Sequence, residues 1–144
     1  MIQVIVAFFA TIAFSGLFNV PKEQYLFCGL TGALGWFFYL NVYSLGQSIV
    51  IACFVATLVL TLVSRFFAVY RKMPITIFLI SGIFPLVPGA GIYYTAYYMI
   101  INDNVLAFEK GMETAKIALV IALGIVFVLS LPQKMFNIIN KVHR

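Results

Sequence analysis

The sequence contains very little charge. Only 9% of its 144 residues are Asp, Glu, Lys or Arg, whereas 64% are hydrophobic. A soluble domain carries about 25% charged residues, so this chain has too few to cover a surface that faces water. We therefore expect lipid to cover most of it. The net charge of +5 is gathered at the ends of apolar segments, which favours anionic lipid headgroups over nucleic acid as partners.

Residues that catalyse reactions or bind metals are also scarce. The single histidine is His143, and the two cysteines, Cys28 and Cys53, lie inside apolar stretches. Two cysteines are too few for a disulfide framework or a zinc site, so we expect two buried thiols. No nucleophile elbow, P-loop or metal-ligand motif is present in the sequence. We predict that the protein uses no metal or cofactor and is not an enzyme.

Five long apolar segments dominate the chain. They cover residues 2–20, 25–43, 47–70, 74–101 and 113–132. About 20 apolar residues cross a bilayer as a helix, and continuous apolar runs indicate helices rather than alternating strands. The sequence predicts an all-α, polytopic transmembrane helix bundle of about five spans, in one domain over residues 1–144. Four spans remain an alternative if the fourth segment is re-entrant. No basic residue precedes the first segment, so we expect it to stay as a membrane helix rather than be cleaved as a signal peptide.

Basic residues are distributed unequally between the two sides of such a bundle. With five spans, one side receives seven of them: Lys22, Arg65, Arg71, Lys72, Lys134, Lys141 and Arg144. The other side receives Lys110 and Lys116. Because basic loops stay in the cytoplasm, we expect the C-terminus there and the N-terminus outside. Arg65 directly follows an apolar run, and we expect its head group to reach the cytoplasmic interface.

The fourth apolar segment is interrupted near its middle by Pro85, Pro88, Gly89 and Gly91. Proline removes a backbone donor and clashes with the preceding turn, so we expect a broken helix near the bilayer midplane. Broken helices form the binding sites of many transporters. A half-helix that begins near Gly89 would direct free amides and partial positive charge at a carboxylate. A proline kink that only shapes the bundle is the alternative.

Four tyrosines follow the break in two columns with i,i+4 spacing: Tyr93 with Tyr97, and Tyr94 with Tyr98. One column could line a substrate path with hydroxyl groups, and we include Tyr93, Tyr94 and Tyr97 among the candidate substrate-binding residues. An aromatic belt at the outer interface is the alternative, and we favour it for the outermost pair.

Polar residues elsewhere in the apolar segments are few. Thr11, Ser15 and Asn19 are spaced by four in the first segment. The two hydroxyl groups can bond to their own helix backbone, whereas Asn19 cannot do so easily, so Asn19 is the candidate for substrate binding. Glu113, four residues after Glu109, is a candidate proton carrier near the membrane edge. A solvated turn with ion pairs to the neighbouring lysines is the alternative.

The second segment carries Gly29, Gly32 and Gly35, which leave a groove for close packing of another helix of this chain or of a partner. We interpret Trp36, which follows the last of these glycines, as a lipid-facing anchor at the interface.

Several of these elements together resemble the threonine/serine exporter family, in its C-terminal membrane domain, which in many bacteria is a separate small subunit. The matching elements follow in the same order over nearly the whole chain: Phe18-Asn19-Val20-Pro21, Gly32-Ala33-Leu34-Gly35, Pro74, and Phe84-Pro85-Leu86-Val87-Pro88-Gly89 with Tyr93.

The resemblance implies a secondary exporter of threonine and serine that is driven by the proton gradient, in the inner membrane of a bacterium. It also implies a separately encoded, larger membrane subunit as partner. A related two-gene pair is linked to succinate export, so an amino acid or a dicarboxylate is the expected substrate. The alternative is a structural subunit that transports nothing itself and stabilises the larger partner.

Overall fold

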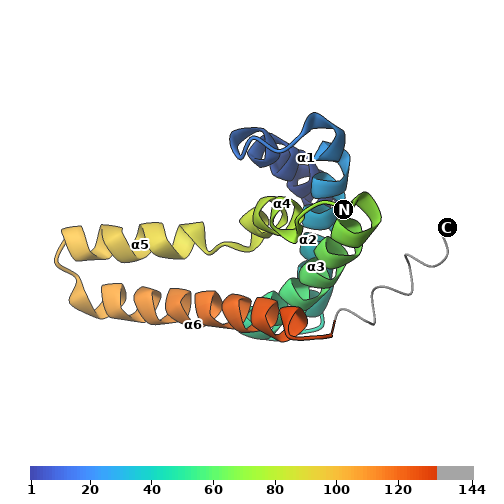
Figure 1. Cartoon of the computed structure of the whole chain (residues 1–144). Helices are drawn as coiled ribbons and strands as arrows, with labels where there is room; N and C mark the ends of the chain where they lie inside the picture. The colour runs from blue at the N-terminus through green and yellow to red at the C-terminus, as the bar shows by residue number, and fades with distance from the viewer. Residues whose placement is uncertain (133–144) are drawn as a thin grey trace.

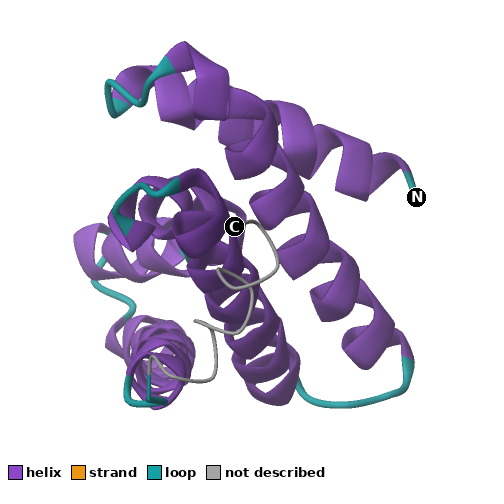
Figure 2. Cartoon of the chain, turned by 45° about the vertical axis from the view of Figure 1, so that its right-hand side comes forward, coloured by secondary structure: helices purple, strands orange, loops and turns teal. Residues whose placement is uncertain are grey.

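The computed structural model describes residues 1–132, and within them it contains helices and turns but no strand (Figure 2). The α-helices are α1 (Ile2–Leu17), α2 (Tyr25–Ser44), α3 (Ile49–Arg71), α4 (Ile75–Ile83), α5 (Gly89–Ile100) and α6 (Asn104–Leu129). Two short 3₁₀ turns, η1 (Lys22–Gln24) and η2 (Phe84–Leu86), precede α2 and follow α4. The predicted all-α class is confirmed, and Cys28 and Cys53 are buried free thiols as expected.

The helices agree broadly with the predicted spans. Three are long and apolar enough to cross a membrane: α2 with its preceding turn (Lys22–Ser44), α3 and α6. The two helices around the break, Ile75–Leu86 and Gly89–Ile100, make a fourth span if they are counted together. The remaining apolar helix, α1, is shorter than these.

Helices α1 to α4 form a compact bundle in which α2 packs against the other three. The glycines of α2 make this contact close. A methyl group on Gly29 would overlap Phe8 and Ile12 of α1, and one on Gly32 would overlap Thr11. Gly35 is equally close to Leu60 of α3. The groove predicted from these glycines is therefore filled by helices of the same chain.

The C-terminal half of α6 packs on α3, with both helices running in the same direction. Gly124 lies against Thr57, and further along both helices Arg65 donates to the carbonyl oxygens of Val128 and Leu131, at 2.7 Å each. Arg65 is only 8% exposed and its head group lies at the end of α6; the expectation that it reaches the interface stays a prediction. The last turn of a helix has carbonyls without intrahelical donors, and these hold the guanidinium inside.

The N-terminal half of α6 and the whole of α5 lie side by side and project from the bundle as an arm (Figure 1). Within the part of the chain that the structure describes, α5 has no buried residue. Helix α6 begins at Asn104, where the Asp103 side chain accepts from the Leu106 amide at 3.1 Å. This start is nine residues before Glu113, where the apolar segment begins, because hydropathy locates the apolar part of a helix and not its polar first turns.

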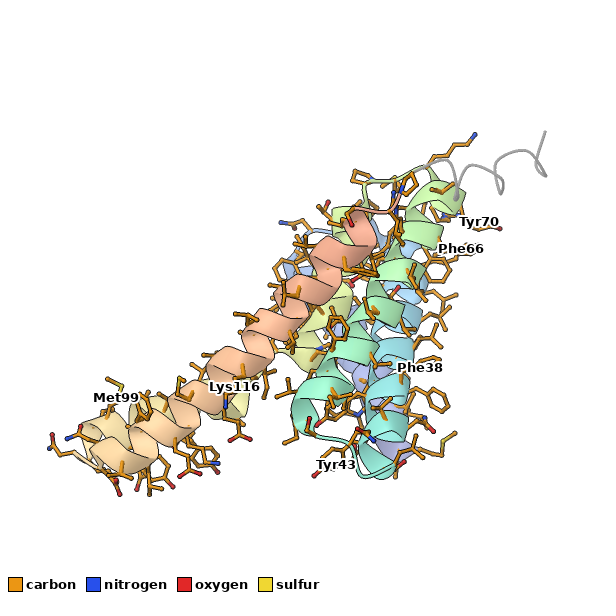
Figure 3. The ribbon with its side chains drawn as sticks, turned by 90° about the horizontal axis from the view of Figure 1, so that it is seen from below. Phe38, Tyr43, Phe66, Tyr70, Met99 and Lys116 are labelled. Carbon is orange, nitrogen blue, oxygen red and sulfur yellow. The ribbon has the colours of Figure 1, made fainter. Side chains whose placement is uncertain are left out.

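The basic residues at the described helix ends gather as the charge distribution predicted. Arg71 at the end of α3 donates to Gln24 at 3.0 Å, so it lies at the same end of the bundle as Lys22. Lys116 lies on the arm, at the end where Tyr43 lies and away from Tyr70 (Figure 3). Lys134, Lys141, His143 and Arg144 lie outside the described residues, and the orientation of the bundle in the membrane stays a prediction.

Candidate functional site

The fourth apolar segment is broken where its prolines predict. Helix α4 runs into η2, the chain is extended at Val87, and α5 begins at Gly89. The two helical parts are bent by 54° relative to each other. Pro85 lies in η2, and Pro88, which lacks an amide hydrogen, is the residue before α5.

The start of α5 presents backbone amides. The amide of Gly89 donates to Val87 O at 2.7 Å, and Ile92 makes the first bond of the helix, to Pro88 O at 3.1 Å. The amides of Ala90 and Gly91 precede that bond, so this end carries the partial positive charge of a helix N-terminus. The two glycines differ in their surroundings. A methyl group on Gly91 would overlap Thr114 of α6, whereas one on Gly89 would meet nothing within 4 Å.

A cavity of about 360 Å³ lies beside the break, between α2, α3, α5 and α6. Its wall contains Pro88, Gly89, Gly91, Tyr94 and Glu113, five of the residues that the sequence analysis selected. Its wall also includes Trp36, Tyr39, Ile49, Cys53 and Lys110. The fold thus brings the start of α5 together with the Glu113 carboxylate, which lies 22 positions after Gly91 in the sequence.

The cavity lies near one end of α3. Its lining includes Ile49, the first residue of α3, and Cys53, one turn later. The break is therefore level with the beginning of this 23-residue span, not with its middle. The same cavity is lined by Glu113 and Thr114, near the middle of α6, because the bend turns α5 away from the bundle to run along α6. The position of the break at the bilayer midplane stays a prediction.

Charge of both signs lies at the cavity wall. Lys110 and Glu113 form an ion pair at 3.2 Å, and their side chains are 37% and 44% exposed. An ion pair this exposed adds little to stability, so its charges are free to exchange partners with a charged ligand. The cavity can therefore offer a cation, a carboxylate and helix-terminal amides to one molecule.

The other candidate residues lie away from this cavity. Tyr93 and Tyr97 stack on each other at 6.4 Å, and their side chains are largely exposed on the surface of α5. Asn19 ends α1 in the left-handed conformation, with φ of 53°, which asparagine tolerates better than most residues. It lines a different groove, beside α4. Thr11 and Ser15 bond to their own helix as expected, at 2.7 and 2.8 Å.

Trp36 belongs to the cavity, which the sequence analysis missed. Its ring stacks on Tyr39 at a centroid distance of 4.8 Å. Its indole Nε1 is buried and has no hydrogen-bond partner among the described residues. The interpretation as a lipid-facing anchor is wrong, because the side chain is half-buried at the cavity wall. The signal was its spacing of four from Gly32, which places both residues on the packed face of α2.

Comparison with known proteins gives one result. The family model described as "Threonine/Serine exporter, ThrE" matches residues 3–131, nearly all of the described chain and both hollows. No curated protein and no solved structure matches the chain significantly. The family match agrees with a helical membrane protein whose cavity lies at a broken helix. The chain therefore belongs to the threonine/serine exporter family and has a transporter-type function.

Proposed function

We propose that this chain forms part of the substrate path of a two-component secondary exporter of small amino acids, with serine and threonine as its substrates. The observation that carries the proposal is the cavity at the break, which is lined by the start of α5 and by the Lys110–Glu113 ion pair of α6. In this proposal the protein resides in a bacterial inner membrane, and its C-terminus faces the cytoplasm.

The charges of the cavity complement a zwitterion. Helix N-terminal amides and a lysine ammonium attract a carboxylate, and the Glu113 carboxylate attracts an ammonium group. A bound amino acid exchanges the Lys110–Glu113 pair for two ion pairs of its own. Succinate has two carboxylates and no ammonium group, so it leaves Glu113 facing a like charge. This argument favours serine and threonine over succinate, the other substrate that the sequence suggested.

Glu113 is also the residue that we propose for proton coupling. Ionisable groups in membrane helices commonly carry protons in transporters. When Glu113 binds a proton it loses its attraction for the ammonium group of the substrate. Proton binding and substrate binding then compete at one carboxylate, which is what an exchange of proton for amino acid requires.

A larger membrane subunit is the proposed partner. Its support is the arm, whose surface carries exposed apolar side chains, among them Ile92, Ile100, Val105 and Phe108. In this proposal the partner covers one face of the arm and completes the path beside the cavity, while lipid covers the rest.

Efflux from cells that lack their own exporters tests the proposal. Cells would be loaded with labelled serine, threonine or succinate, and would express this chain alone or with its larger partner. We expect efflux of serine and threonine only when both subunits are present, and loss of efflux with Pro88→Ala and Glu113→Gln. The unfolding temperatures of both variants, compared with that of the unchanged protein, are the control for folding.

Two results would contradict the proposal. If neither amino acid leaves the cells although both subunits reach the membrane, the substrate assignment is wrong. If Pro88→Ala and Glu113→Gln keep full efflux while removal of this chain destroys the partner's assembly, the chain is a structural subunit that transports nothing itself.

Direct binding gives a second measurement. Trp36 is the only tryptophan of the sequence, and it lies at the cavity wall. Threonine added to the purified complex, with the partner's tryptophans replaced, should change the Trp36 fluorescence in a saturable way, and succinate should not. Equal responses to both would show that the cavity does not select a zwitterion.

A further inference from the structure

The buried and half-buried serine and threonine hydroxyl groups of the helices follow one rule, and Ser81 is the one among the described residues that departs from it. Eight of them donate to the carbonyl oxygen four residues earlier in their own helix, at 2.7 or 2.8 Å: Thr11, Ser15, Thr31, Thr57, Thr61, Ser64, Thr95 and Thr114. Ser81 in α4 is fully buried, and its Oγ has no hydrogen-bond partner among the described residues.

The reason lies in the carbonyl that Ser81 would otherwise use. Ile77 O, four residues earlier, already accepts from the Cys28 thiol of α2 at 3.6 Å. The Cys28 sulfur is within weak hydrogen-bonding reach of the Ser81 hydroxyl, but sulfur is a poor acceptor and does not replace an oxygen partner. A buried hydroxyl left unpaired costs about 1–3 kcal/mol, and buried groups of this kind commonly have a specific explanation.

Ser81 lines a groove of about 220 Å³ between α4 and the end of α1. Asn19 and Thr76 supply two further polar side chains, and the other walls are apolar, with Val20 and Ile80 among them. The groove is far larger than the roughly 10–15 Å³ that a single buried water needs. All of its lining side chains are neutral, so nothing in it offsets the net charge of an ion.

We propose that this groove is a second binding site for the transported molecule, and that it takes a small hydroxyl-bearing amino acid. The inference rests on the proposed function. A zwitterion has no net charge to offset, and the Ser81 hydroxyl, the Asn19 amide and the Thr76 hydroxyl can pair with its polar groups. The apolar wall suits the methyl group of threonine, and a dianion such as succinate is excluded.

In the sequence, the α4 residues of the groove and the α5 residues of the cavity are separated by Phe84. Groove residues Thr76 to Ser81 precede Phe84, and cavity residues from Leu86 onward follow it. The Phe84 ring stacks on Phe14 at 4.0 Å and lies 5.4 Å from Phe18, which lines the groove. Two sites separated by a packed aromatic cluster are what a stepwise path along α4 requires.

Ser81→Ala tests the inference, with Ser64→Ala as the matched control. Ser64 is equally buried, but its hydroxyl is bonded to Leu60 O at 2.8 Å. The purified two-subunit complex would be titrated with labelled threonine to count bound molecules, while Trp36 fluorescence reports the cavity alone. The unfolding temperature without ligand would be measured in parallel.

We expect Ser81→Ala to weaken one class of threonine sites about tenfold, to leave the Trp36 response unchanged, and not to lower the unfolding temperature. Ser64→Ala should keep both classes of sites.

If Ser81→Ala binds threonine as the unchanged protein does, the groove holds only water or lipid and the inference is wrong. If the unchanged complex gives a Trp36 response but contains one class of sites, the groove inference fails while the proposed function stands. If neither readout detects threonine, the proposed function fails and this inference falls with it.

Discussion

The guanidinium Nη1 of Arg65 lies 2.7 Å from the carbonyl oxygen of Val128, which joins the C-terminal third of α3 to the last turn of α6. A positive charge at the C-terminal end of a helix is favoured by the helix dipole. The same side chain bonds Leu131 O, just beyond the end of α6. One buried cation thus holds the α6 end that is remote from the arm.

Replacement of this cation should destabilise the protein. In Arg65→Met both carbonyls lose their charged donor in apolar surroundings, and we expect a loss of about 2 kcal/mol or more in the free energy of unfolding. The stability of Arg65→Lys should lie between that of the unchanged protein and that of Arg65→Met. An ammonium group keeps the charge but lacks the planar fork that reaches two carbonyl groups. Thermal unfolding of the purified protein, followed by circular dichroism, measures the effect. Arg71→Met is the control, and a loss as large as that of Arg65→Met would contradict the assigned role.

The stability of the contact between α1 and α2 should depend on the size of the side chains there. A methyl group on Gly32 would overlap the Thr11 side chain, and overpacking of this kind costs about 1–3 kcal/mol. Gly32→Ala should therefore lower the unfolding temperature, whereas Gly89→Ala should not. Alanine has the higher helix propensity in a helix interior, so propensity alone would stabilise Gly32→Ala and cannot account for a loss. Equal unfolding temperatures for the two variants would show that α1 and α2 are not packed this closely.

The indole nitrogen of Trp36 should contribute to substrate affinity. Trp36→Phe keeps an aromatic ring beside Tyr39 but removes the buried donor, which is unpaired without substrate. One net hydrogen bond is worth about 1 kcal/mol, so we expect threonine binding to weaken by roughly fivefold. Labelled threonine measures this, because the variant has lost its fluorophore. Unchanged affinity in a variant that unfolds at the normal temperature would show that the indole nitrogen does not contact the substrate.

Much of the fold was predictable because membranes impose simple rules on sequence. The apolar segments, the glycine contacts of α2 and the break before Gly89 all follow from hydropathy, residue size and the missing amide of proline. The start of α6 was not predictable in this way, because Glu109 and Lys110 suit a helix as well as a turn. The backbone carbonyl group that the Arg65 side chain binds lies more than 60 positions away in the sequence, so no local sequence pattern could identify it.

The candidate site was predictable only in part for the same reason. The sequence pointed to Pro88, Gly89 and Glu113 separately, and the packing of α5 on α6 brings them to one cavity. No sequence pattern predicted the unpaired hydroxyl of Ser81. Its carbonyl partner, Ile77 O, is occupied by the Cys28 thiol of another helix. Such competition for one carbonyl is visible only in three dimensions.

The bend before α5 has a mechanical consequence. The arm joins the bundle on one side through the short extended link at Val87 and Pro88, and on the other side through α6, a continuous helix pinned at its far end by Arg65. Helices α5 and α6 pack along each other, so Tyr94 and Glu113 are set relative to each other by the arm alone, whereas Trp36 reaches the same cavity from the bundle. The width of the cavity therefore depends on the angle at which the bend sets the arm against the bundle.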